Sequence, residues 1–155
     1  MIERQQRIAW IEAVLEEYLA ASTAADLLAA RTKIDPSFGN RHGWTARAGV
    51  AFAENLEATY IIRIYTEFEA ALRDYWLRFL KKLTRPKMFQ LVNEAIPDQR
   101  FSVDVVDHAD EIRVYRNYLV HDNEDEAGGK IVPFSVQESK SRLCAYLGCL
   151  NPRWR

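Results

Sequence analysis

The longest regular pattern of apolar residues runs from Val50 to Leu83. This spacing predicts one helix of about 34 residues, roughly 50 Å long. Because a strict four-residue row drifts around a helix of 3.6 residues per turn, we expect its apolar face to wrap around several partners. Thr84 and Pro86 are expected to end it. The row recurs at every fourth position: Phe52, Leu56, Tyr60, Ile64, Phe68, Leu72, Trp76 and Leu80.

Helical spacing also predicts a first helix from Ile2 to Thr32, with glutamates opposite its apolar face. Its alanine-rich second half either continues as helix or breaks near Ser22. A short helix is expected from Pro86 to Ile96, because proline is favoured at a helix start and a second proline follows it. The stretch KIDPSFGNRHGWTARAG after the first helix predicts a loop of about 15 residues.

Two further helices are predicted from their capping residues. Ser102 is the expected N-cap of a helix from Val103 to about His121. Ser135 and Glu138 form a capping-box pattern that starts a last helix reaching Leu150. Between them, KIVPF is an extended segment or a brief strand. These elements predict an all-α bundle of about five helices, one of them very long.

The composition is that of a soluble globular protein, with 48% hydrophobic and 28% charged residues. The 155 positions suit a single domain, 1–155. A net charge of -1 excludes a protein-wide positive field, so an anion site must be local. A charged start and no apolar run of membrane length predict a cytoplasmic protein without a secretory signal. Cys144 and Cys149 are expected to be free thiols of the core.

Candidate chemistry gathers at the end of the Val103–His121 helix. Asn117 and His121 are four positions apart and therefore lie on one face. Arg116 is offset from His121 by about 140°, but its long side chain can reach the same face. An imidazole can exchange a proton with a ribose hydroxyl, and a guanidinium can bind phosphate oxygens and stabilise developing charge. This chemistry requires no metal ion and no other cofactor.

A structural interpretation of the same residues is also open. In it, Arg116 pairs with a nearby carboxylate and His121 stabilises the C-terminal end of its helix. His42, in the predicted loop, is interpreted as a solvated histidine. One acidic cluster has a spacing that matches no metal-binding motif: Asp107, His108, Asp110 and Glu111.

The stretch RNYLVH, from Arg116 to His121, resembles the arginine-polar-x-x-x-histidine signature of the HEPN superfamily, the higher eukaryote and prokaryote nucleotide-binding domains. IYTEFEAALRDYW, inside the long predicted helix, is similar to the aromatic and glutamate stretch of several HEPN branches, with Glu69 at the acidic position. The resemblance covers roughly residues 50–121.

The HEPN resemblance implies a helical bundle that forms a homodimer and brings two such motifs into one cleft. It implies metal-independent RNA cleavage by attack of the 2′-hydroxyl, which leaves a 2′,3′-cyclic phosphate. Arg116 would contact the phosphate, Asn117 would support it, and His121 would act as acid and base. Many prokaryotic relatives are toxins or phage-defence effectors, often with an antitoxin protein as partner.

The charge pattern both supports and opposes an RNA substrate. Residues 98–126 hold nine acidic side chains against three arginines, which would repel RNA unless the acids point away or are masked. Lys81, Lys82, Arg85 and Lys87 are expected to form a basic rim that binds substrate. The terminal Arg153-Trp154-Arg155 is either an RNA-stacking element or a disordered tail.

Three functions therefore remain open from the sequence. The first is a cytoplasmic HEPN-type endoribonuclease that works as a homodimer. The second is a non-catalytic HEPN-like module that binds a nucleotide or a partner protein, which the acidic segment favours. The third is a helical dimerisation domain in which Arg116 and His121 are structural.

Overall fold

The computed structural model describes residues 3–96, 103–121, 131–151 and 153–154. In these ranges the chain forms six α-helices and one π-helical segment, so the predicted all-α class is confirmed. Residues 131–134, within KIVPF, form no strand, and Lys130 lies outside the described residues.

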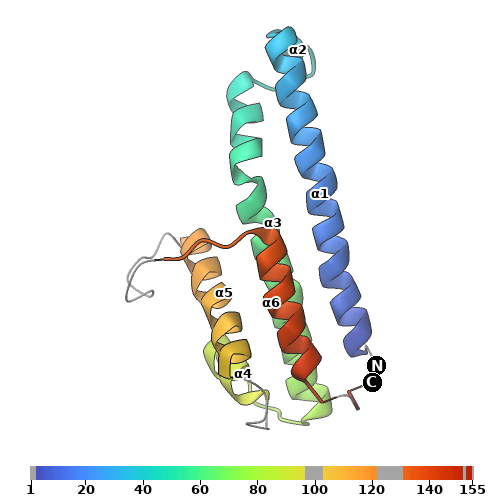
Figure 1. Cartoon of the computed structure of the whole chain (residues 1–155), viewed down its shortest axis with the longest axis vertical. Coiled ribbons are helices and arrows are strands. Elements are labelled where there is room, and N and C mark those ends of the chain that lie inside the picture. The colour runs from blue at the N-terminus through green and yellow to red at the C-terminus, as the bar shows by residue number, and fades with distance from the viewer. Residues whose placement is uncertain (1–2, 97–102, 122–130, 152, 155) are drawn as a thin grey trace.

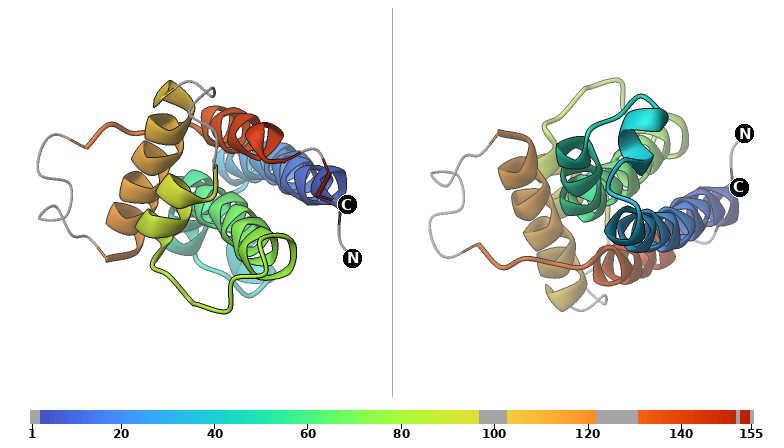
Figure 2. Two further views of the ribbon diagram at one scale, coloured as in Figure 1. Left: turned by 90° about the horizontal axis from the view of Figure 1, so that it is seen from below. Right: turned by 90° about the horizontal axis from the view of Figure 1, so that it is seen from above.

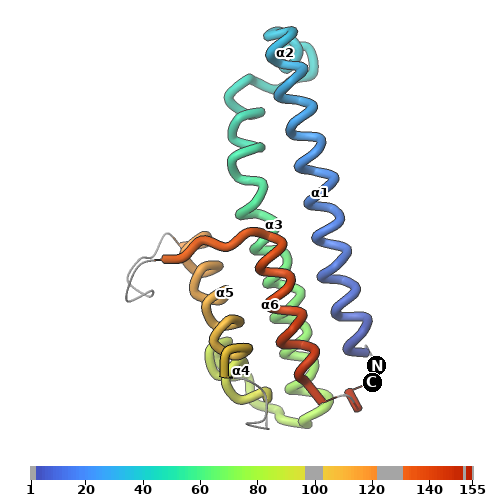
Figure 3. The backbone as a smooth tube through the Cα atoms, viewed as in Figure 1, coloured from blue at the N-terminus to red at the C-terminus, as the bar shows by residue number. Residues whose placement is uncertain are grey.

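The scaffold is a long antiparallel hairpin of α1 (Arg4–Ile34) and α3 (Ala46–Asp74), which Figure 1 shows standing vertically. α1 has 31 residues and runs through Ser22 without a break. α3 has 29 residues, so the expectation of one exceptionally long helix is not confirmed. The upper half of the hairpin extends beyond the other helices, as the backbone tube in Figure 3 makes clear.

The tip of the hairpin is more ordered than the predicted loop. A short helix, α2 (Phe38–Arg41), lies between α1 and α3, and Thr45 caps α3 by accepting a hydrogen bond from Ala48 N (3.2 Å). The Trp44 ring fills the space beside two glycines: a Cβ at Gly39 or Gly49 would come within 2.8 Å of it. The loop prediction was therefore wrong over α2, because tertiary packing around one tryptophan organises the turn.

The lower half of the hairpin is covered by the remaining helices. α6 (Val136–Cys149) packs against α1 and α3, while α5 (Val103–His121) packs against α6 and α3, with α4 (Met88–Glu94) beside it. The end-on views in Figure 2 show this arrangement around α3. The buried residues form one cluster centred on α3 residues such as Ile64, Phe68 and Leu72. The apolar face of α3 thus contacts several partners, as its drifting pattern predicts.

α3 ends differently from the prediction. At Tyr75 the chain changes to the π-helix η1 (Tyr75–Phe79), where Leu80 N donates to Tyr75 O (3.0 Å) and Lys82 N donates to Trp76 O (3.1 Å). Lys81 adopts the left-handed region, with φ at 54°. The helix therefore stops before Thr84 and Pro86, because these widened turns redirect the chain before the proline is reached.

The capping residues gave accurate predictions for the later helices. α5 has the bounds expected from the sequence, although its predicted N-cap Ser102 lies outside the described residues. The capping box of α6 is present: Glu138 N donates to Ser135 Oγ (3.2 Å), and Ser135 N donates to a Glu138 carboxylate oxygen (3.0 Å). Cys144 and Cys149 are free and half-buried. Burial raises the pKa of the Cys144 thiol to about 11.

The C-terminal end is part of the core. Trp154 is only 1% exposed and meets the Tyr75 ring edge-on, with centroids 5.2 Å apart. Arg4, at the start of α1, donates to Leu150 O (2.9 Å) and so ties the two ends of the chain together (Figure 1). The tail is therefore neither an RNA-stacking element nor disordered at Trp154, because its ring is covered by the core.

Candidate functional site

Helix α5 presents three of the predicted site residues on a partly buried surface. Ala109 and Ile112 are its buried residues and face the core. Arg116 and Asn117 are half-buried, whereas His121, the last residue of the helix, is exposed. The end of α5 therefore joins a packed surface to solvent.

The Arg116 side chain turns toward Asn117. Its Nη1 donates to Asn117 Oδ1 at 3.1 Å. Because Asn117 and His121 share a face of α5, this bond draws the guanidinium toward that face despite the angular offset in the helix. No hydrogen bond joins Arg116 to His121 in the described part of the chain.

The charge of Arg116 is not neutralised by a carboxylate. Along the described ranges, no acidic side chain lies within ion-pair distance of it, whereas Arg113 pairs with Asp110 (2.6 Å) and Arg142 pairs with Glu111. Its Nε is buried and has no hydrogen-bond partner. The alternative in which Arg116 forms an ion pair is thus not seen among these residues. A buried unpaired donor is costly and calls for an explanation.

Tyr65 of α3 is a neighbour that sequence reasoning placed only in the core. The Arg116 guanidinium lies 5.7 Å from the centre of its ring, and its buried hydroxyl also lacks a hydrogen-bond partner. Burial raises the pKa of Tyr65, and the positive charges of Arg113 and Arg116 oppose that rise. Its position one turn before Glu69, on the helix stretch that carries the resemblance, was the available signal.

Glu69 does not contact the Arg116 group directly. Its carboxylate pairs with Arg73, one turn further along α3, at 2.7 Å. Its negative charge still contributes to the raised pKa of Tyr65. Glu69 therefore links the site to the lower part of α3 and leaves Arg116 unpaired.

His121 occupies the position that both interpretations require. As the basic residue in the last turn of α5, it favourably meets the negative end of the helix dipole. Its exposure also leaves the imidazole accessible from solvent. Both the structural and the chemical roles are compatible with this placement.

The three predicted substrate-binding cations lie at the other end of α5, on the connection between η1 and α4. Lys81, Lys82 and Arg85 are all exposed. Lys82 Nζ lies 4.0 Å from the centre of the Trp76 ring. These residues are not brought together with His121, because α5 runs away from them toward the middle of the hairpin (Figure 1).

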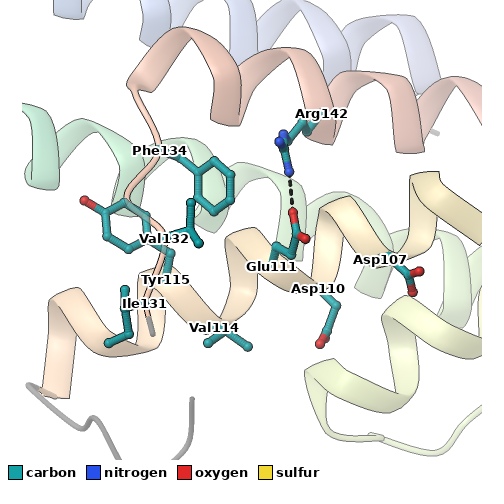
Figure 4. Close-up of a pocket in the computed structure, with 9 residues that line it drawn as sticks. All are labelled: Asp107, Asp110, Glu111, Val114, Tyr115, Ile131, Val132, Phe134 and Arg142. Carbon is teal, nitrogen blue, oxygen red and sulfur yellow. Dashed lines mark hydrogen bonds and ion pairs between the residues drawn. The ribbon is translucent and has the colours of Figure 1, made fainter. Parts of the chain in front are cut away.

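A different surface of α5 is acidic. Figure 4 shows Asp107, Asp110 and Glu111 along a cleft of about 520 Å³ that the apolar side chains of Ile131 and Val132 close on the other side. Arg142 bonds Glu111 across this cleft, as the dashed line shows. The described part of the acidic segment thus points partly into its own cleft and not toward Tyr65.

Two searches of the described residues bear on the remaining predictions. No group of three or more histidine, cysteine or acidic side chains is arranged to hold a metal ion in these ranges. None of the helices in the described ranges combines the length and the apolar character needed to cross a membrane.

Comparison with protein-family models, with curated proteins and with solved structures finds no match to this chain.

Proposed function

We propose that the chain is a metal-independent endoribonuclease of the HEPN type, in which Arg116, Asn117 and His121 act on a phosphodiester. The observation that carries the proposal is the state of Arg116. Its guanidinium is turned toward the His121 face by Asn117 and has no carboxylate partner in the described structure. A cation held in this way, next to solvent, suits an anion supplied from outside.

The proposed reaction uses these groups as follows. His121 accepts the proton of a ribose 2′-hydroxyl, the 2′-oxygen attacks phosphorus, and the bond to the 5′-oxygen breaks. The leaving oxygen receives a proton from an imidazolium, so the products are a 2′,3′-cyclic phosphate and a 5′-hydroxyl. Arg116 stabilises charge on the phosphate oxygens in the transition state. Asn117 holds Arg116 in place, and the Tyr65 ring supports it from below.

A homodimer is part of the proposal, because the resemblance places two such motifs in one cleft. The exposed apolar residues on the protruding hairpin support self-association: Leu27 is 68% and Ile34 is 77% exposed. Light scattering is expected to give a mass of about twice the 18.0 kDa of the chain. A toxin or phage-defence role belongs to the same proposal, with growth arrest on expression as its readout.

The decisive experiment compares two histidines of one helix. Wild-type protein incubated with an RNA pool is expected to produce 2′,3′-cyclic phosphate ends, with EDTA present or absent. His121→Ala is expected to lower the rate by about 10²- to 10⁴-fold while the circular dichroism spectrum stays the same. His108→Ala removes an exposed histidine elsewhere on α5 and is the matched control.

Two outcomes would contradict the proposal. Equal cleavage by wild type and by His121→Ala would assign the activity to a contaminant or to another residue. Arg116→Lys keeps the positive charge but loses the planar fork of donors, and is expected to slow cleavage strongly. Full activity in that variant would remove the role given to the guanidinium.

The second candidate is a non-catalytic module that binds a nucleotide or partner protein. The acidic cleft of Figure 4 favours it, because carboxylates beside apolar walls suit a basic segment of a partner protein. This candidate predicts no cleavage of any RNA pool. Its test is the loss of partner affinity when Asp107 is changed to Asn, with His121→Ala unaffected.

A further inference from the structure

A second cleft, separate from Arg116, lies where η1 turns toward α4. It has a volume of about 800 Å³ and is lined on one side by Trp76, Leu77 and Leu83. Its other lining includes three cations, Arg73, Arg85 and Lys87, and no acidic side chain. The connection from Lys81 to Lys87 carries four basic residues and no acidic one. This is a local positive site on a chain whose net charge is -1.

The cleft is held by fixed contacts of the connection. Trp76 Nε1 donates to Thr84 Oγ1 (3.2 Å), and an Nη of Arg73 donates to Pro86 O (3.4 Å). Lys81 stands in the left-handed region, which costs a residue with a Cβ about 1 kcal/mol or more. π-Helical turns and strained residues of this kind concentrate at functional sites. Arg85 and Lys87 are exposed, and neither has an acidic partner in the described ranges.

An aromatic ring connects this cleft to α5. Phe89, two positions after Lys87, is 55% exposed, and the Arg113 guanidinium lies 5.6 Å from the centre of its ring. Arg113 is one turn before Arg116 on α5. An exposed ring flanked by guanidinium groups is the type of platform on which nucleobases stack. Cations, ring and Arg116 therefore follow one another along a single track.

The length of the track suits several nucleotides. Tyr65, beside Arg116, and Arg73, at the cleft, are eight positions apart on α3, which corresponds to about 12 Å. His121 lies about 7.5 Å beyond Arg116 along α5. A single strand lying along this path would place a phosphate in the cleft and another at Arg116. A folded duplex would not present its base faces to Phe89.

We infer that the cleft of Arg85 and Lys87, together with Phe89, is a binding site for single-stranded RNA that anchors the strand away from the cleavage position. This inference rests on the proposed function for its choice of RNA. Binding at the cleft itself is expected to be independent of His121. The cleft holds the phosphates, Phe89 stacks on one base, and the apolar wall of Leu77 and Leu83 excludes water on one side.

The test measures binding and its salt dependence in protein that cannot cleave. His121→Ala is titrated into a fluorescein-labelled 12-nucleotide single-stranded RNA, and anisotropy is followed from 50 to 200 mM salt. The double variant Arg85→Ala/Lys87→Ala in this background is expected to lower the slope of log K against log salt by about 1.4, which is about 0.7 for each phosphate contact. Phe89→Ala is expected to weaken binding about fivefold or more at every salt concentration.

The control removes equal charge from the far end of the molecule. Lys33 and Arg47 are exposed near the hairpin tip, and Lys33→Ala/Arg47→Ala is expected to leave the slope within about 0.3 of the parent. Equal slopes for the cleft and tip variants, or no RNA binding by His121→Ala at 50 mM salt, would overturn the inference. Cleavage by wild type is measured separately. RNA binding that depends on the cleft, without cleavage, would support the inference and reject the ribonuclease.

Discussion

The C-terminal tryptophan offers a direct test of how the end of the chain is used. Trp154 is 1% exposed, and its ring meets Tyr75 edge-on beneath η1. We expect Trp154→Ala to destabilise the fold, because it removes a large side chain from the core near the basic cleft. If the tail instead reached into solvent to stack on RNA, the same change would leave stability almost unaltered.

The expected loss follows from the buried area. A buried tryptophan removes about 150–250 Å² from water, worth about 4–6 kcal/mol at 25 cal/mol per Å². This is an upper limit, because the unfolded chain also covers part of that surface. Near the chain end, residues 151–154 can also detach and regain backbone freedom. We therefore expect a loss of about 3 kcal/mol, at the low end of the range for Trp→Ala in cores.

Urea unfolding followed by circular dichroism measures this loss. Trp154→Phe is the matched variant: it keeps an aromatic ring against Tyr75 and removes an indole N–H that is buried without a partner. Its expected loss is below about 1.5 kcal/mol. Arg153→Ala changes an exposed neighbour and is expected to stay within about 0.5 kcal/mol of wild type. A Trp154→Ala protein as stable as Arg153→Ala would refute the burial argument.

Three further predictions concern local features of the fold. Lys81→Gly is expected to stabilise the protein by about 1 kcal/mol in urea unfolding, because glycine accepts the left-handed backbone without strain, while Lys81→Ala is expected to give no such gain. Tyr146→Phe is expected to cost about 1–3 kcal/mol by the same measurement, because it removes the buried hydroxyl that donates to Val92 O at 2.6 Å; an unchanged midpoint would contradict this. Cys144, whose pKa is raised to about 11 by burial, is expected to react about a hundredfold more slowly with a disulfide reagent at pH 8 than a free thiol, and the stability that it contributes is present below the pKa of the unfolded thiol and lost as pH rises toward 11. Rapid modification of Cys144 in folded protein would contradict that placement.

The cation track and the Arg116 group divide the proposed work between them. The track along Arg85, Lys87 and Phe89 is expected to determine affinity, whereas Arg116 and His121 are expected to determine rate. The acidic cleft of α5 opens onto a different surface, beside residues 131–134, so its charges oppose RNA at a distance. Because buried and exposed charges are screened differently, the salt slope separates these contributions.

Much of the fold was determined by local sequence. Capping residues and prolines predicted the bounds of α5, the start of α6 and the short α4, because a helix end depends on hydrogen bonds within one turn. The apolar row predicted α3 as a helix with a drifting face, because periodicity reports which side is buried. The group of Arg116, Asn117 and His121 was also chosen from spacing alone.

Only the tertiary structure decided how these elements end and whom they meet. The π-turn at Tyr75 and the left-handed Lys81 depend on Trp76 and Thr84 meeting across the turn, which no local pattern encodes. Glu69 pairs with Arg73, and Arg116 turns to Asn117 above Tyr65, because side chains with several rotamers choose partners that only packing brings near. Burial of Trp154 likewise required the core to be assembled, since a terminal tryptophan reads the same in solvent or against Tyr75.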